Sequence, residues 1–392
     1  MKLEERFRLH PQAEVVDLGA PSLATLIDCL NDGRTIHASQ RSRRPITMGS
    51  GSEQWLECET SGSTGKPKTI RRSPESWMTS FDLAKTLFDV SERDHYAVLG
   101  SLGHSLSLFA ALEALHIGAK LSVISEMSPK TQLQALQSRS VTVMYATPTQ
   151  LRQLFTSISR NEDTPIKSVR RILVGGGKLF LGEQERIASL FPAANVTEFY
   201  GTSETSFVTY SGATTPSGSV GRLYPGVDVM ISDNRDPTVC GEIRVRSPYL
   251  AEAYAGSIKD PLIQVDGFVS TGEIGYRDED GFFFIKGRRD RMVTISDVNV
   301  YPEAIEQTVA SFDGVKACAV VSKADDLRGN RTVCYVEALS DHFDLSELRR
   351  FCRERLGGKH VPKELLIIPA IPVLPSGKPD LNSLQELASA QK

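Results

Sequence analysis

The sequence predicts an α/β fold: a large N-terminal domain, with mostly parallel sheets and a small antiparallel β region, precedes a small C-terminal α+β domain. The chain has 392 residues, and at roughly 100–200 residues per domain we expect two or three domains. Strand-like runs alternate with helix-like segments from residue 95 to 201, and short strands broken by Gly, Pro and Asp follow from 218 to 290. A third pattern of helices and strands fills the rest, so we place the boundary at Asp290, between residues 1–289 and 290–392.

The alternating region predicts a largely parallel sheet, because parallel neighbours need a crossover connection that is usually a helix. Helix-like segments such as Ser107–Leu115 and Pro148–Ser157 supply such crossovers. The expected strands are His95–Leu99, Lys120–Ile124, Val141–Ala146, Arg171–Gly175 and Val196–Tyr200.

The C-terminal part predicts a separate small domain. Leu345–Leu356 is expected to be a helix, with Asp344 as its N-cap and Gly357 as its C-cap. The other expected elements are the antiparallel strands Val227–Ile231, Glu242–Arg246 and Phe282–Ile285, the helix Pro302–Ser311, and the strands Val315–Ser322 and Thr332–Leu339.

Charge and composition exclude several classes of function. The chain carries 45 basic and 48 acidic residues, so no overall field attracts nucleic acid or anionic lipid. No apolar core follows the charged N-terminus, and no run of about 18 apolar residues occurs. We therefore expect a cytoplasmic protein that binds neither nucleic acid nor membrane. The six cysteines form no C-x-x-C pair, which predicts reduced, mostly buried thiols and no zinc site.

The segment from Thr60 to Lys68 has the chemistry of a polyphosphate-binding loop. Its two glycines let the backbone bring N–H groups close to an anion, its hydroxyl groups add neutral donors, and its lysines match phosphate charge. It is not a Walker A loop, because G-x-x-x-x-G-K-[ST] occurs nowhere in the chain. A flexible Ser/Gly linker is the alternative interpretation. The candidate nucleotide-binding residues are Thr60, Ser61, Gly62, Ser63, Thr64, Gly65, Lys66 and Lys68.

This loop resembles the phosphate-binding signature of the adenylate-forming (ANL) superfamily, which contains acyl-CoA synthetases, peptide-synthetase adenylation domains and luciferases. Four further motifs resemble that family in the same order, so the resemblance covers almost the whole chain. Family members usually carry a longer segment before the loop, which makes this chain an unusually short member. The four motifs are Tyr200-Gly201-Thr202-Ser203-Glu204, Ser270–Glu273, Gly287–Glu306 and Pro375–Lys378.

The resemblance implies an AMP-forming acid–thiol ligase that uses ATP and Mg²⁺. A carboxylate oxygen attacks the α-phosphorus of ATP, pyrophosphate leaves, and the acyl-adenylate then passes its acyl group to a thiol, most simply that of CoA. Such chemistry depends on positioning and charge neutralisation. Lys378 is the implied catalytic cation between carboxylate and α-phosphate, although a lone lysine is ordinarily a solvated surface residue. Asp290 is the implied hinge of a mobile small domain.

Three residues have implied roles in the large domain. Glu204, with Thr64, would hold Mg²⁺ against the phosphates, although a glutamate in the first turn of a helix would look the same. Tyr200 would lie on the adenine, unless it is a core aromatic residue. Gly201, Thr202 and Ser203 belong to the same motif.

The remaining nucleotide contacts include departures from the family pattern. Gly176, Gly177 and Lys178 would border the adenine, but Lys178 replaces a small alanine. Glu273 stands where the family has an aspartate that binds the ribose hydroxyls. Arg288 would contact ribose or phosphate, with a solvated linker arginine as the alternative.

The acyl substrate is less well specified. His104 resembles a histidine common in aryl and fatty acyl-CoA ligases, where it gates the acyl pocket, but a helix-start histidine with a local hydrogen bond is equally consistent. No acidic residue stands at this gate, which disfavours an α-amino acid. An aryl or short to medium acyl carboxylic acid is therefore expected, and its identity stays open.

The acceptor also leaves alternatives. Ser296-Asp297 stands where acyl-CoA synthetases usually have a Gly-Gly pair beside the thiol tunnel. The phosphopantetheine of an acyl or aryl carrier protein is therefore an alternative to CoA. A degenerate, non-catalytic nucleotide- or acyl-binding module is the second alternative, because Lys178, Glu273 and Asp297 all depart from the pattern. A monomer and a homodimer are both compatible with the sequence.

Overall fold

The computed structural model divides the chain into two units. The large unit holds Met1–Met230, Arg244–Thr271 and Asp278–Phe283, and the small unit holds Ile231–Ile243, Gly272–Arg277 and Phe284–Lys392. The boundary at Asp290 stays a prediction. The residues that the structure describes are 6–16, 21–51, 53–60, 68–157, 164–179, 181–232, 239–255, 262, 264–296, 298–325, 329–340, 342–358, 360–374 and 379–390.

The principal sheet of the large unit is mostly parallel, as predicted. Its strand order is β1-β7-β6-β8-β9-β10-β11-β12. Within this order, each neighbouring pair from β1 through β10 is parallel. The last two pairs, β10 with β11 and β11 with β12, are antiparallel. The strands are β1 (Glu14–Val15), β6 (His95–Val98), β7 (Lys120–Val123), β8 (Val143–Ala146), β9 (Arg171–Val174), β10 (Asn195–Thr202), β11 (Ser206–Tyr210) and β12 (Arg222–Leu223).

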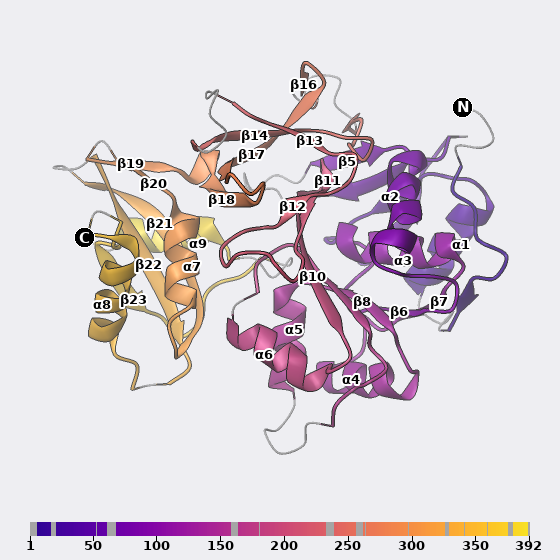
Figure 1. Ribbon diagram of the computed structural model, residues 1–392, viewed down its shortest axis with the longest axis horizontal. Helices are drawn as coiled ribbons and strands as arrows, with labels where there is room; N and C mark the ends of the chain where they lie inside the picture. Colours follow the sequence, from indigo (N-terminus) through magenta and orange to yellow (C-terminus); the bar gives the residue numbers. More distant parts are fainter. Residues whose placement is uncertain are drawn as a thin grey trace. The chain divides into compact units, whose positions relative to one another are not determined.

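Helices cover both faces of this sheet (Figure 1). Met144 of β8 lies in a buried apolar cluster with residues of α4 (Pro129–Ser138), α5 (Pro148–Thr156) and α6 (Leu181–Leu190). The next residue, Tyr145, points to the opposite face, because side chains alternate along a strand, and its ring lies 5.8 Å from Phe109. Phe109 belongs to α3 (Ser105–Ile117), which packs with α2 (Pro74–Leu87). The alternating sequence pattern therefore produces the layered architecture that it predicted.

A second sheet of the large unit was not predicted. Its order is β15-β5-β4-β2-β3, and β4 and β5 are the antiparallel pair on either side of the Thr60–Lys68 segment. These strands are two to four residues long, and β4 and β5 carry charged side chains, so no continuous apolar run marks them in the sequence. They are β2 (Ile36–Ala38), β3 (Ile46–Met48), β4 (Leu56–Glu59), β5 (Thr69–Arg72) and β15 (Ala253–Tyr254), and α1 (Pro21–Asn31) precedes them.

Most strands of the region predicted as short β-strands between residues 218 and 290 form a five-stranded sheet, whereas β12 and β15 join the two sheets described above. The order of the five-stranded sheet is β13-β14-β17-β16, with β18 paired to β17. The strands are β13 (Asp228–Ile231), β14 (Gly241–Arg246), β16 (Gln264–Val265), β17 (Phe268–Arg277) and β18 (Phe283–Arg288).

The small unit contains a three-stranded sheet of β21 (Val315–Asp325), β22 (Gly329–Ala338) and β23 (Glu364–Ile367). Cys334 of β22 packs with α7 (Pro302–Ala310) and α8 (Leu345–Leu356), whereas its neighbour Tyr335 packs with α9 (Leu381–Ala390). The predicted helix Leu345–Leu356 is confirmed: Asp344 accepts hydrogen bonds from the N–H groups of Ser346 and Glu347, and Gly357 ends the helix with a φ of 75°.

Helices α1 to α9 are 9 to 14 residues long. In the described part of the chain, none is long and apolar enough to cross a membrane, since a span needs about 20 residues. All six cysteines are free thiols, and Cys29, Cys58, Cys334 and Cys352 are buried.

Glu113 is a buried carboxyl group that makes stability depend on pH. It is 1% exposed, and the Tyr145 hydroxyl donates to its Oε2 at 2.8 Å. Burial raises the pKa of Glu113 from 4.5 to about 8. Between these values the native state keeps a proton that the unfolded state has lost. The free energy of unfolding should therefore fall as pH rises from about 4.5 to about 8, by at most ~1.4 kcal/mol per pH unit.

Urea unfolding at several pH values checks this expectation. Glu113→Gln should flatten the decline, because glutamine does not titrate. The exposed Glu252 provides a control, Glu252→Gln, which should keep the wild-type slope. An unchanged slope in Glu113→Gln would show that other groups control this pH range.

Candidate functional site

Several residues singled out from the sequence follow neighbouring parallel strands of the large unit. Strands β6, β8, β9 and β10 lie side by side, so their carboxyl ends meet at one edge of the sheet. His104 follows β6, Gly176 and Lys178 follow β9, and Tyr200 lies near the end of β10. Strands β6 and β8 are neighbours in the sheet. After β6 the chain crosses to β7, on the side away from β8, and after β8 it crosses to β9, on the side away from β6. Ligands of α/β sheets bind at such a topological switch point.

The Gly175–Lys178 loop is tied to β10. Glu198 of β10 accepts a hydrogen bond from the N–H of Leu179 at 2.9 Å. A Cβ at Gly175 would lie 2.2 Å from the Phe199 ring, and Gly176 has a φ of +77°, so both positions favour glycine. Burial lowers the pKa of Lys178, and the charge of Glu198 acts in the opposite direction.

Glu204 lies in a turn between two strands, not at the start of a helix. The β10–β11 hairpin has an irregular register between Tyr200 and Gly201. Thr202 and Thr205 fix the turn, because the N–H of each donates to the hydroxyl oxygen of the other at 3.1 and 3.2 Å. Glu204 therefore does not lie in the first turn of a helix, as the alternative interpretation supposed, but in a turn closed by hydrogen bonds between Thr202 and Thr205.

Gly201 allows this turn to close. A Cβ at Gly201 would lie 1.8 Å from the carbonyl oxygen of Ser206, a distance that no relaxed structure accommodates. We expect Gly201→Ala to lower the free energy of unfolding by about 1–3 kcal/mol or more, measured by urea denaturation. Gly212→Ala is the matched control, because nothing lies within 4 Å of its added Cβ. Equal stability of the two variants would contradict the assignment of Gly201.

The two ends of the Thr60–Lys68 segment meet at its base. The N–H of Thr60 donates to the carbonyl oxygen of Lys68 at 2.8 Å, and the N–H of Lys68 faces the Thr60 hydroxyl at 3.3 Å. Thr60 and Lys68 therefore continue the antiparallel pairing of β4 and β5. The predicted nucleotide-binding residues Ser61, Gly62, Ser63, Thr64, Gly65 and Lys66 lie outside the described residues.

Tyr254 joins the base of this loop to Glu204. The Lys68 ammonium lies 4.6 Å from the centre of the Tyr254 ring, and the Tyr254 hydroxyl donates to Oε1 of Glu204 at 3.2 Å. The N–H of Ala251 donates to the carbonyl oxygen of Glu204 at 2.8 Å. Tyr254 could not be recognised from the sequence, because it lies in a two-residue strand and in none of the motifs. The structure brings Lys68 and Glu204 together through it.

The surroundings of Glu204 fit a magnesium ion that is also bound by phosphate. Among the described residues, no group of three or more His, Cys, Asp or Glu side chains could hold a metal by itself. Magnesium commonly takes one or two carboxylates and completes its octahedron with water and substrate phosphates. Glu204 is half-buried and can supply such a carboxylate, whereas Thr64 lies outside the described residues.

His104 caps a helix. Its Nδ1 accepts a hydrogen bond from the N–H of Leu106 at 3.2 Å at the start of α3. The local hydrogen bond of the alternative interpretation is thus present, and a catalytic role of His104 stays a prediction.

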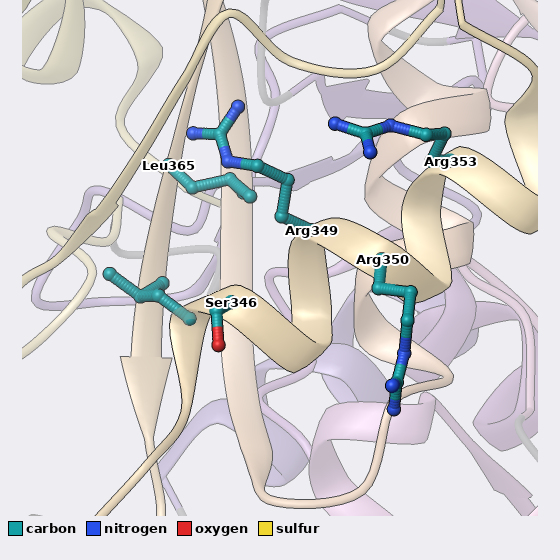
Figure 2. A pocket seen from close by; sticks show the side chains of 6 residues that line it. Ser346, Arg349, Arg350, Arg353 and Leu365 are labelled. Carbon is teal, nitrogen blue, oxygen red and sulfur yellow. The ribbon is translucent and has the colours of Figure 1, made fainter.

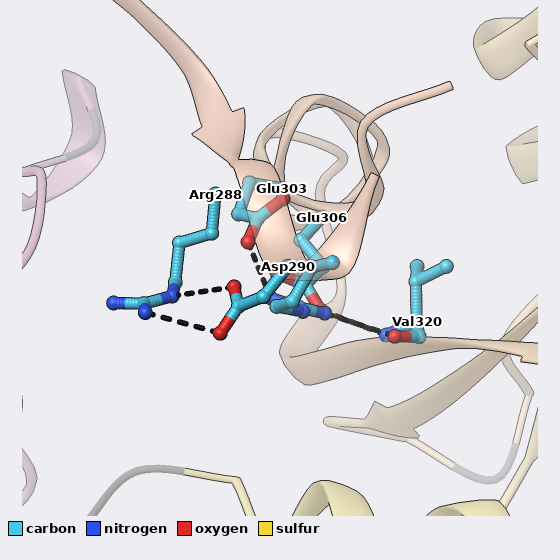
Figure 3. A network of polar contacts seen from close by, with 6 residues as sticks. Arg288, Asp290, Glu303, Glu306 and Val320 are labelled. Carbon is cyan, nitrogen blue, oxygen red and sulfur yellow. Dashed lines mark hydrogen bonds and ion pairs between the residues drawn. The ribbon is translucent and has the colours of Figure 1, made fainter. Parts of the chain in front are cut away.

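In the small unit, Glu273 and Arg288 lie on the paired strands β17 and β18. Nε and Nη2 of Arg288 donate to the two carboxylate oxygens of Asp290 at 2.9 and 3.1 Å (Figure 3). This bidentate pair raises the pKa of Arg288, and the charge of Glu273 adds to the effect. Asp290 thus holds the guanidinium that the family resemblance assigns to the nucleotide.

The chain is firmly anchored directly after Asp290. Arg291 donates to Glu303 at 3.0 Å, to Glu306 at 2.7 Å and to the carbonyl oxygen of Val320 at 2.9 Å (Figure 3). These bonds attach residue 291 to α7 and β21. Lys378, the predicted catalytic lysine, lies outside the described residues.

Ser296 has a backbone conformation that favours glycine. It begins the two-residue connection between β19 (Val293–Ile295) and β20 (Val298–Val300), and its φ is +47°. Positive φ is unusual for a side chain of this kind, which fits the expectation that relatives carry glycine here. Asp297 lies outside the described residues.

A hollow of about 430 Å³ lies beside α8 in the small unit. Figure 2 shows Arg349 and Arg353 extending to the same side of α8, with Arg350 extending to the other. Arg349 donates to the carbonyl oxygens of Pro362 and Lys363 at 3.4 and 3.5 Å. Of the predicted site residues that the structure describes, none lines this hollow.

Comparison with protein families identifies the class of this chain. Residues 57–255 match the AMP-binding enzyme family, and residues 304–378 match the C-terminal domain of AMP-binding enzymes. The chain therefore belongs to the AMP-binding, adenylate-forming superfamily, as the motifs predicted.

Its relatives include ligases that act with CoA. The chain is 32% identical over 327 residues to the uncharacterized acyl–CoA ligase YhfT of Bacillus subtilis, a match that covers 81% of this chain and 65% of YhfT. It is 29% identical over 332 residues to 2-succinylbenzoate–CoA ligase of Listeria monocytogenes, covering 83% of this chain and 68% of that enzyme. The chain thus spans about two thirds of the length of these curated relatives.

A solved structure with a similar fold is that of the amide bond synthetase McbA from Marinactinospora thermotolerans. The TM-score is 0.73 at 25% sequence identity, and the match covers 88% of this chain and 72% of McbA.

Proposed function

We propose that this chain activates a carboxylic acid with ATP and Mg²⁺, releases pyrophosphate, and passes the acyl group from acyl-AMP to the thiol of CoA. Membership of the AMP-binding enzyme family and the names of its relatives support this reaction class. The single observation that supports it best is the contact chain from Lys68 through Tyr254 to Glu204. Through the Tyr254 side chain, these contacts connect a cation at the base of the Thr60–Lys68 loop with a carboxylate that can hold a divalent ion.

In this proposal the large unit binds Mg²⁺–ATP. The loop N–H and hydroxyl groups, together with Lys66 and Lys68, hold the phosphates. Glu204, with Thr64, holds Mg²⁺, which would neutralise charge on the leaving pyrophosphate. Tyr200 and the loop from Gly176 to Lys178 border the adenine, and the turn Gly201–Ser203 keeps Glu204 in place.

The small unit supplies the groups that act on the reacting atoms and the ribose. Lys378 neutralises the charge that builds up as the carboxylate oxygen bonds to the α-phosphorus. Glu273 accepts hydrogen bonds from the ribose hydroxyls, and Arg288 contacts ribose or phosphate. A change of backbone conformation at Asp290 turns the small domain of residues 290–392 between adenylation and thiol transfer, as hinges do. Glu273 and Arg288 precede this hinge and do not turn with that domain.

The acid in this proposal is an aryl or short to medium acyl carboxylic acid. The name of the Listeria relative, 2-succinylbenzoate–CoA ligase, supports an aryl acid. Aromatic rings also lie next to the turn that carries Glu204: the buried Phe207 ring of β11, directly after the turn, is 4.2 Å from the half-buried Phe199 ring and 5.2 Å from the buried Phe109 ring. His104 would lie at the entrance of the acyl pocket.

ATP–pyrophosphate exchange with a panel of carboxylic acids tests the activation step. We expect acid-dependent incorporation of labelled pyrophosphate into ATP, fastest with aryl or short to medium acyl acids. A folded sample that shows no exchange with any acid would contradict the proposal and favour a non-catalytic binding module.

The acceptor needs a separate test, because carrier-protein phosphopantetheine is an alternative to CoA that Asp297 favours. Because McbA is named an amide bond synthetase, an amine should also be tested as acceptor. Mass spectrometry of products formed with CoA, a phosphopantetheinylated carrier protein and an amine should detect acyl-CoA as the main product. Exclusive acylation of the carrier protein or the amine would replace CoA in the proposal.

A further inference from the structure

Arg72 is a fully buried cation beside the candidate metal carboxylate. It ends β5, the strand that begins directly after Lys68, and it is 2% exposed. Its Nη2 donates to the carbonyl oxygen of Ser203 at 2.5 Å, and its Nη1 donates to the carbonyl oxygen of Tyr249 at 2.8 Å. The guanidinium also lies 5.0 Å from the Trp77 ring. Among the described residues, no carboxylate forms an ion pair with it.

The two carbonyl groups belong to the two segments that hold Glu204. Ser203 immediately precedes Glu204 in the β10–β11 turn. Tyr249 begins the segment that leads to Ala251 and Tyr254, both of which donate hydrogen bonds to Glu204. Arg72 therefore connects the turn, the segment behind it and the strand that leaves the Thr60–Lys68 loop.

A buried guanidinium without a paired carboxylate is costly, and an apolar strand residue of similar volume would avoid that cost. Burial lowers the pKa of Arg72 to about 10, so the side chain still carries its charge at neutral pH. Glu204 is one of the groups whose charge acts on Arg72. The hydrogen bonds to Ser203 and Tyr249 offset part of the cost of burial. They also fix the positions of the two segments that contact Glu204.

We infer that Arg72 is a positioning residue, which holds the Glu204 turn in the geometry needed to bind Mg²⁺–ATP. This inference rests on the proposed function, in which Glu204 is the magnesium ligand. Arg72 acts through Glu204 and does not itself contact the metal. Supporting groups of this kind typically change metal affinity by about 10–100-fold when they are lost.

Metal binding measured without turnover tests the inference. Arg72→Met removes both donors and the charge but keeps an unbranched side chain, whereas Arg72→Lys keeps the charge. With ATP present, the dissociation constant of Mn²⁺, read by electron paramagnetic resonance as a stand-in for Mg²⁺, should rise by about tenfold or more in Arg72→Met. Arg72→Lys should fall between this variant and the wild type, and ATP binding without metal should change little.

Two controls separate positioning from general stability. Leu136→Ala removes a fully buried side chain of α4 and should lower the melting temperature without changing Mn²⁺ affinity. In a Glu204→Gln background, Arg72→Met should have little further effect on Mn²⁺ affinity, because coupled residues are not additive.

Wild-type Mn²⁺ affinity in Arg72→Met would overturn the inference. If that variant does not fold, wild-type affinity in Arg72→Lys would overturn it equally. Full additivity with Glu204→Gln would also contradict it, because Arg72 would then act elsewhere. Failure of the proposed function would show differently, as absence of pyrophosphate exchange in the wild-type protein.

Discussion

Replacing Lys378 with alanine is expected to lower ATP–pyrophosphate exchange by about a hundredfold or more. In the proposed reaction, negative charge from the carboxylate and the α-phosphate meets in the transition state, and the Lys378 ammonium neutralises it there. In the same proposal, other residues bind the adenine, the ribose and the outer phosphates. The affinity for ATP, measured by calorimetry, should therefore change little.

Lys363→Ala is the matched control for Lys378→Ala. Lys363 is an exposed lysine of the same unit, and its removal should leave exchange unchanged. If Lys378→Ala retained full exchange activity, the role assigned to Lys378 would be wrong.

Replacing Glu204 with glutamine is the second change with a large expected effect. Glutamine keeps the size of the side chain and can still accept from the Tyr254 hydroxyl, but it lacks the charge that a hard divalent cation requires. We expect exchange at limiting Mg²⁺ to fall by about 10–100-fold, with partial recovery as Mg²⁺ is raised. A magnesium titration of the exchange rate provides the measurement.

Glu252→Gln serves as the control for Glu204→Gln, because Glu252 is an exposed carboxylate of the same unit. Its magnesium dependence should match that of the wild type. Unchanged magnesium dependence in Glu204→Gln would show that Glu204 is not a magnesium ligand. The Thr60–Lys68 segment would then be the main support for nucleotide binding.

The parallel sheet and the small α+β unit could be predicted from the sequence, because their signals are local. The strand expected at Arg171–Gly175 is found at Arg171–Val174, and the helix expected at Leu345–Leu356 has those bounds. In the first case a short apolar run is bounded by turn residues. In the second, a capping aspartate and a glycine mark the two ends. Such signals depend on neighbours within a few residues, so one sequence contains them.

The short strands and the supports of Glu204 could not be predicted, because they depend on contacts between residues far apart in the chain. Arg72 is 131 positions from Ser203, and Tyr254 is 50 positions from Glu204. A strand as short as β15 has no periodicity of its own and is defined by its pairing with β5. The sequence motif identified Glu204 as a candidate, but it contained no sign of the residues that hold it.

The transfer of oxygen-18 from a labelled carboxylic acid to AMP tests the central claim most directly. If the carboxylate oxygen attacks the α-phosphorus, that oxygen stays on phosphorus when the acyl group leaves. Mass spectrometry should then find one oxygen-18 atom in each AMP formed with a labelled acid and CoA. AMP without the label, formed at the same rate as the acyl product, would contradict adenylation of the acid by this chain.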